Sequence, residues 1–323
     1  MASSQYDLIM IASTVSISQP AHLSLAKGQL QISLKTSGVI DTIPIDSLGY
    51  LIFDHPQITL THALLAKLGT YQVATVICDS KHLPISLTLP LYGHHLSQER
   101  FHHQLNAPLP LKKQLWKRVI IQKIDHQSLL LKEKQALATY RLLQQFKSEV
   151  RSGDSSQKEA QAAKHYWKAL FGSAFFRDPK REDFYNLALN YGYAILRAMV
   201  ARALIGSGLL PFAGIHHHNR YNPYCLADDI MEPYRPWVDR YLYHLQLPQR
   251  AAPTQLSKEE RAQLLEIPYL ACHIKEGQSQ LHIGIAQTTA SLAKVYYTQN
   301  HRLITFPSLP CDEKKKKRNT KKN

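Results

Sequence analysis

DFYNLALNYGYAILRAMVARALI, residues 183–205, carries the strongest helical pattern of the chain. Its apolar side chains recur every three or four residues, which places them on one continuous stripe of a helix. The stripe consists of Leu187, Tyr191, Ala194, Ile195, Ala198 and Met199. Gly206 and Gly208 follow directly and are typical of a helix end. We therefore expect one long helix here, inside a region that reads as helical from residue 91 onward.

The segments on either side of this helix continue the helical pattern. We expect helices at 112–126, 127–150, 156–171, 226–244 (with a kink at Pro233), 257–265 and 283–298. Residues 1–90 read differently, because short runs of Ile, Val, Tyr and Phe predict strands. A hairpin is expected around Ala26–Gly28, and one helix at Thr61–Leu68 with Gly69 as its stop.

These patterns define a fold class and a domain plan. The fold class is α+β: an N-terminal β-sandwich domain followed by a larger, all-α-helical C-terminal domain. We place the first domain at residues 1–90 and the second at residues 91–313. Residues 314–323 are low in complexity, rich in Lys, and expected to be a disordered basic tail.

Charge is distributed unevenly along the 323 residues. The chain has 39 Lys and Arg against 24 Asp and Glu, a formal net charge of +15. Residues 1–80 have a net charge of −2, whereas the last ten residues alone contribute seven positive charges. An excess of this kind points to a polyanion such as DNA as partner. We expect the tail to contact phosphates non-specifically and to be dispensable for chemistry.

The four cysteines and the hydropathy pattern exclude several classes of protein. Cys78, Cys225, Cys272 and Cys311 are too far apart for a C-x-x-C zinc or redox pair. No disulfide framework, signal peptide or membrane-spanning segment is expected. We therefore expect a cytoplasmic protein that has no membrane partner.

The richest candidate for chemistry is GIHHHNRYNPYCLADDIMEPYRP, residues 214–236. It places three histidines in a loop before a short helix on which Asp229 and Glu232 share a face. A histidine from the loop can fold over that face, and two carboxylates with one imidazole suit Mg²⁺ or Mn²⁺. A plainer interpretation stays open: a surface His triplet, and carboxylates that complement a helix dipole.

Other candidates are weaker on the residues alone. Ser156–Glu159 fits the capping box S-x-x-E, in which the Glu159 side chain would bond the backbone N–H of Ser156. The pattern favours that structural role for Glu159 over a metal ligand. The pairs His94-His95 and His102-His103 could suggest a second metal site, but we interpret them as surface groups. Candidate nucleic-acid contacts are Tyr221, Tyr224, Tyr234 and Arg235.

Three blocks in fixed order resemble a known family: EAQAAKHYW (159–167), NYGYAIL (190–196), and GIHH (214–217) followed by LADDIMEPYRP (226–236). They are similar to the CRISPR-associated integrase of spacer acquisition, the first-numbered protein of the adaptation module, in its type II form. The resemblance covers nearly the whole chain. It implies a β-sandwich, a helical domain and a homodimer. It also implies a small ferredoxin-like companion in a heterohexamer, and double-stranded DNA, both spacer precursor and CRISPR repeat, as substrate.

The resemblance also implies site residues. Glu159, His217 and Glu232 would be the catalytic metal ligands for Mg²⁺ or Mn²⁺, with Asp229 in a supporting role. A DNA 3′-hydroxyl would then attack a phosphodiester of the repeat, and the cation would offset the developing charge. Two alternatives stay open: a standalone metal-dependent DNA repair nuclease, and a DNA-binding scaffold without chemistry.

Overall fold

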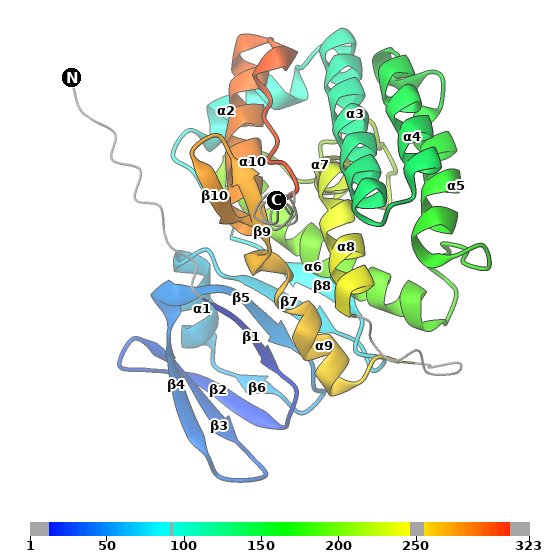
Figure 1. The fold of residues 1–323 in the computed structure, drawn as a ribbon. Helices are drawn as coiled ribbons and strands as arrows, with labels where there is room; N and C mark the ends of the chain where they lie inside the picture. Colours follow the sequence, from blue (N-terminus) through cyan, green and yellow to red (C-terminus); the bar gives the residue numbers. More distant parts are fainter. Residues whose placement is uncertain (1–12, 91–92, 246–254, 311–323) are drawn as a thin grey trace, which may run out of the picture.

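The computed structural model describes residues 13–90, 93–245 and 255–310. Strands come first in the chain and helices follow, and Figure 1 shows the two groups as separate layers. Cys311 and the basic tail lie outside the described residues, so the expectations for them stay predictions. In the part of the chain that is described, no helix is both long enough and apolar enough to cross a membrane.

The strands form two four-stranded sheets. One has the order β1 (Ser13–Ile17), β5 (Leu48–Phe53), β7 (Ala74–Cys78) and β8 (Pro84–Thr88). The other has the order β4 (Ile40–Pro44), β3 (Gln29–Leu34), β2 (Ala21–Ala26) and β6 (Thr59–Leu60). Pairing is parallel among β1, β5 and β7, whereas β8 is antiparallel to β7.

The expected β2–β3 hairpin is confirmed. Lys27 (φ 50°) and Gly28 (φ 77°) occupy its turn, both left-handed as a two-residue hairpin turn requires. Helix α1 (His62–Thr70) also forms, and the Thr61 hydroxyl caps it by accepting the Leu64 N–H. The predicted stop at Gly69 is wrong, because Gly69 lies inside the helix and the left-handed residue is Gln72 (φ 54°).

Both sheets and α1 contribute to one cluster of buried apolar side chains. It includes Leu23 and Leu30 from one sheet, Leu51 from the other, and Leu64 from α1. Strands followed by helices confirm a mixed α/β chain with a helical C-terminal part. The finer description as a β-sandwich stays a prediction, as do the domain boundaries.

The helical part begins with α2 (Ser97–Leu105) and α3 (Leu109–Glu133) and continues with α4 (Leu137–Glu149) and α5 (Lys158–Phe171). The break expected at 126/127 is wrong. The buried apolar positions of α3 run without interruption from Leu111 to Leu131, so the helix continues. The chain turns only at Gln135, which is left-handed (φ 64°).

The predicted long helix is α6 (Phe184–Gly206), capped by Asp183, whose carboxylate accepts the Asn186 N–H. It runs between the β7–β8 edge and the other helices (Figure 1). At Gly192 a side chain would lie 2.5 Å from Val238 Cγ1, so glycine allows close packing against the helix that carries Val238. Helix α6 thus fixes how the helical part sits on the sheet.

The remaining elements follow α6. They are α7 (Cys225–Met231), the 3₁₀ turn η3 (Glu232–Tyr234), α8 (Arg235–Leu245), α9 (Lys258–Leu264) and α10 (Leu281–Thr298). The kink expected at Pro233 is therefore present as η3. The expectation of an all-helical C-terminal domain is wrong in one respect, because β9 (Ala271–Ile274) and β10 (Gly277–Gln280) form an antiparallel hairpin.

Candidate active site

A buried carboxylate organises the histidine loop. Asp229 on α7 is 0% exposed. Its Oδ2 accepts the backbone N–H groups of Ile215 (2.6 Å) and His216 (2.9 Å), and its Oδ1 accepts that of His217 (3.2 Å). A Cβ on Gly214 would lie 2.3 Å from the His217 carbonyl oxygen, so the loop folds this tightly only with glycine there.

The same carboxylate also holds the His217 ring. Its Nδ1 donates to Asp229 Oδ1 at 2.6 Å, so Nε2 remains available to a ligand. The hydrogen bond to Asp229 raises the pKa of His217 and outweighs the opposing effect of burial. A histidine whose second nitrogen is tied to a carboxylate is the arrangement found at many metal centres. Asp229 therefore fixes the orientation of the His217 ring, and its supporting role in the chemistry stays a prediction.

Trp116 of α3 packs against the same loop. Its buried ring stacks on His216, with centroids 4.2 Å apart and an interplanar angle of 4°. The His217 ring meets Trp116 edge-on, with centroids 5.6 Å apart. The loop is thus held from α7 by a carboxylate and from α3 by an indole ring.

The two glutamates meet at one cation. Glu159 lies in the first turn of α5 and Glu232 begins η3, yet both contact the ammonium of Lys123 on α3. Lys123 Nζ donates to Glu159 Oε1 at 2.5 Å and also pairs with Glu232 Oε2. Arg235 Nη1 donates to the other Glu232 oxygen at 2.7 Å. Lys123 is 7% exposed and Glu232 5%.

These charges compensate one another. Burial would raise the pKa of Glu232, but Arg235 and Lys123 outweigh it and hold the pKa of Glu232 below its usual range. Burial likewise opposes the ammonium, but Glu232 and Glu159 keep the pKa of Lys123 raised. The two cations therefore hold the Glu232 carboxylate ionised, as a metal ligand must be.

The capping-box interpretation of Glu159 is wrong. Gln157 is left-handed (φ 52°), α5 begins only at Lys158, and Ser156 makes no side-chain cap. Asp154 takes that role instead, because its carboxylate accepts the N–H groups of Lys158 (2.9 Å) and Glu159 (3.0 Å). The Glu159 side chain is thereby free to reach Lys123.

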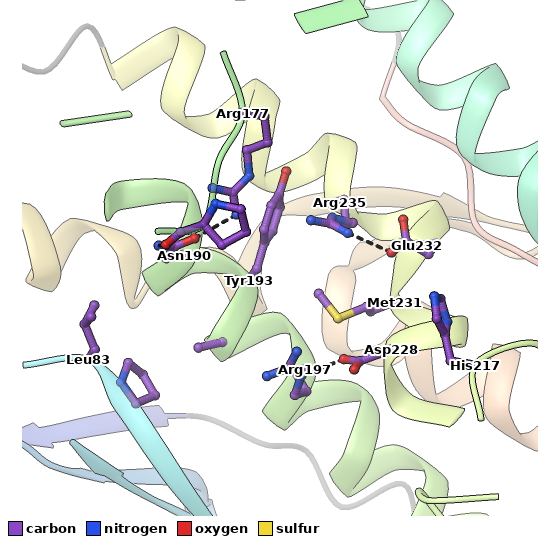
Figure 2. Close-up of a pocket in the computed structure, with 13 residues that line it drawn as sticks. Leu83, Arg177, Asn190, Tyr193, Arg197, His217, Asp228, Met231, Glu232 and Arg235 are labelled. Carbon is purple, nitrogen blue, oxygen red and sulfur yellow. Dashed lines mark hydrogen bonds and ion pairs between the residues drawn. The ribbon is translucent and has the colours of Figure 1, made fainter. Parts of the chain in front are cut away.

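A cleft of about 420 Å³ opens beside Glu232 and His217. Figure 2 shows these two side chains and Met231 on one wall, facing Tyr193 and Arg177. Three guanidinium groups line the cleft: Arg177 bonds Asn186 and Asn190, Arg197 bonds Asp228, and Arg235 bonds Glu232. A cationic cleft of this kind suits phosphate oxygens.

The donor set fits a hard divalent cation, although its members do not converge as they stand. In the described ranges no three His, Cys, Asp or Glu side chains gather closely enough to hold a metal ion. The structure brings Glu159 and Glu232 together around the ammonium of Lys123, and His217, which is held by Asp229, lines the same cleft as Glu232. Two carboxylates and an imidazole suit Mg²⁺ or Mn²⁺.

The sequence interpretation missed Lys123 and Trp116. A signal for Lys123 was present, since it falls on the buried stripe of α3 beside Ile120 and Ile124, where a lysine needs a partner. The predicted nucleic-acid contact of Tyr234 is wrong, because its ring is fully buried and its hydroxyl donates to Thr288. Tyr221 is 77% exposed and stays a candidate.

Comparisons with known proteins give evidence on the family of the chain. Residues 15–271 match the family model described as CRISPR associated protein Cas1. The chain is 40% identical over 223 residues to the CRISPR-associated endonuclease Cas1 of Neisseria meningitidis serogroup C (strain 8013). That alignment covers 69% of this chain and 72% of the relative.

Solved structures share the fold. A casposase bound to integration product superposes with a TM-score of 0.71 at 16% identity, covering 94% of this chain and 96% of that one. A chain of a Cas6-RT-Cas1–Cas2 complex superposes with a TM-score of 0.72 at 19% identity, covering 92% of this chain and 36% of that one. The family match and the shared fold agree, and the chain belongs to the CRISPR-associated protein Cas1 family.

Proposed function

We propose that this protein is a metal-dependent DNA endonuclease and integrase of CRISPR adaptation, which joins short DNA duplexes to a repeat array. One observation carries the proposal. Two carboxylates from separate elements, Glu159 and Glu232, share one buried cation, and Glu232 lines an arginine-rich cleft together with His217, which Asp229 orients. Carboxylates, an oriented imidazole and phosphate-binding guanidinium groups are what metal-assisted phosphoryl transfer needs.

The chemistry assigns a task to each group. Glu159, Glu232 and Nε2 of His217 would hold Mg²⁺ or Mn²⁺, which supplies Lewis-acid stabilisation of the phosphoryl oxygens when bound. Arg177 and Arg197 bind and orient phosphates of the DNA strand. The attacking 3′-hydroxyl forms a new bond to phosphorus and releases the 3′-oxygen of the repeat strand. Water in place of the hydroxyl gives hydrolysis, so one site serves nicking and joining.

The assembly is part of the proposal. We take residues 1–90 as a β-sandwich dimerisation domain and residues 91–313 as the catalytic domain. A homodimer would bind a small ferredoxin-like companion in a heterohexamer. The similar fold found within a Cas6-RT-Cas1–Cas2 complex supports a companion of this kind. Two inserted strand ends need two sites at fixed separation, which a symmetric assembly supplies.

Substitution of the three proposed ligands tests the function. We expect Glu159→Gln, His217→Asn and Glu232→Gln each to lower strand joining on a repeat-bearing plasmid by about 100-fold or more, because several kcal/mol of charge stabilisation is lost. DNA binding in a filter or shift assay should change little. Glu149→Gln is the matched control. It removes a carboxylate of the neighbouring helix α4 that pairs with Lys158 of α5, and it should keep full activity.

The products distinguish the alternatives. Hydrolysis without any joined product would favour a standalone repair nuclease. DNA binding without either product, in wild type and with Mn²⁺ added, would favour a non-catalytic scaffold. Full activity of Glu159→Gln would remove Glu159 from the site.

A further inference from the structure

We propose that Lys123 is a placeholder cation: its ammonium holds the Glu159 and Glu232 carboxylates together in the metal-free protein and leaves both when a divalent cation binds. This inference rests on the proposed function, since it takes these carboxylates as metal ligands. It assigns a role to a residue outside the ligand set. The first support is geometry, because one Nζ contacts an oxygen of each glutamate.

The second support is the cost of the position. Lys123 lies on the buried stripe of α3, between the apolar residues Ile120 and Ile124. Lysine is almost never buried to this extent unless it is paired, because removal of an ammonium from water is expensive. The structure shows two partners for its charge, and both are proposed ligands. A lysine placed only to fill the core would not need to reach these two oxygens.

The third support is the problem that the lysine solves. Glu232 is 5% exposed and shares its surroundings with Glu159, so with no cation between them the two carboxylates would repel each other. Of the two glutamates, Arg235 pairs with Glu232 in the described structure, so it does not link the pair. The ammonium bridges α3, α5 and η3, which keeps both carboxylates aimed at one point before a metal arrives.

Displacement follows from charge. An ammonium and a divalent cation that both stayed in contact with Glu159 Oε1 and Glu232 Oε2 would repel each other strongly, because they would lie within a few ångströms of each other in a buried site. The flexible four-carbon stem of lysine lets the ammonium leave without a change in α3. Metal binding is therefore an exchange of one cation for another.

Two substitutions test this exchange. Lys123→Met keeps the length of the stem and removes the charge, whereas Lys123→Arg keeps the charge. Titration calorimetry with Mn²⁺ alone should show Lys123→Met binding about tenfold more tightly than wild type, because no cation has to be displaced. Lys123→Arg should bind no more tightly than wild type. Lys147→Met removes a lysine paired with Asp125, away from the glutamates, and should match wild type.

Thermal melting adds a readout that needs no activity. Metal-free Lys123→Met should melt below wild type, and Mn²⁺ should raise its melting temperature by more than it raises that of wild type. Equal or weaker Mn²⁺ binding by Lys123→Met, while wild type binds Mn²⁺, would overturn the placeholder role and leave the proposed function intact. No Mn²⁺ binding by any variant would overturn the metal site itself.

If Lys123→Met does not fold, a structure of the wild-type protein tests the inference on its own. A crystal structure with Mn²⁺ should place Nζ of Lys123 out of contact with both glutamates. An ammonium that still bridges Glu159 and Glu232 beside bound Mn²⁺ would overturn the inference.

Discussion

Asp229 shows how a single residue builds the site. It is fully buried, yet it accepts three backbone N–H groups and the His217 ring, so its cost of burial is offset by hydrogen bonds. The sequence indicates that a loop histidine folds over the Asp229–Glu232 face. Which of the three histidines does so depends on the backbone turn at Gly214, and spacing alone does not contain that information.

The His217–Asp229 pair predicts a pH dependence of stability. The folded-state pKa of His217 is raised above about 6.5, so the pair stabilises fully below that pH and loses this contribution as pH rises through the raised value. In metal-free protein, the difference in unfolding free energy between wild type and His217→Gln should therefore be largest below about pH 6.5 and shrink as the pH rises above it. Urea unfolding at several pH values measures it.

His218→Gln is the control for this series, because the exposed His218 makes no hydrogen bond to a carboxylate in the described structure. Its difference from wild type should stay flat over the same range. A His217→Gln difference that is constant or grows with pH would contradict the pairing.

At the scale of elements, one sequence pattern has two outcomes. Ser257–Glu260 and Ser156–Glu159 both read S-x-x-E, and only the first forms a capping box, at the start of α9. The second fails because Asp154 takes the N–H groups of Lys158 and Glu159 and Gln157 turns left-handed. The existence of the helices could be predicted from periodicity, whereas the choice of cap depends on the folded path of the preceding turn.

This difference gives a sharp test at the start of α5. We expect Asp154→Ala to lower the unfolding free energy by about 1–2 kcal/mol, because it removes the cap. Ser156→Ala should be neutral within about 0.5 kcal/mol or slightly stabilising, because the buried Ser156 Oγ has no hydrogen-bond partner among the described residues. Denaturant titration compares the two. A larger loss for Ser156→Ala than for Asp154→Ala would support the capping-box interpretation of Ser156–Glu159 instead.

At the scale of the whole molecule, contacts between residues far apart in sequence join the strands to the helices. Asp54, which follows β5, pairs with Arg261 of α9 at 3.1 Å and with His82 at 2.7 Å. Arg202 of α6 donates to the Gln72 carbonyl at 2.7 Å. The change of pattern near residue 90 predicts that two regions exist. It does not predict these pairs, because neither partner has a local signature.

The Asp54–Arg261 pair predicts how firmly the two regions are joined. We expect Arg261→Met to cost about 3 kcal/mol or more, because it leaves a carboxylate that is 3% exposed without its main counter-charge. Lys81–Glu182 joins the same two regions on the surface, so Glu182→Gln is the matched control and should leave the melting temperature unchanged. If Arg261→Met lowers the stability by no more than Glu182→Gln does, the Asp54–Arg261 pair does not hold the two regions together.

The stacking of Trp116 on His216 has a practical consequence. The chain has three tryptophans. Trp167 packs among Tyr166, Phe171 and Phe175, and Trp237 packs against His126 and Tyr234. Within the described structure, Trp116 is the tryptophan whose ring contacts the histidine loop, so its indole emission reports the state of that loop optically. With Trp167 and Trp237 replaced by Phe, the protein would carry a label-free fluorescent sensor of its own active site.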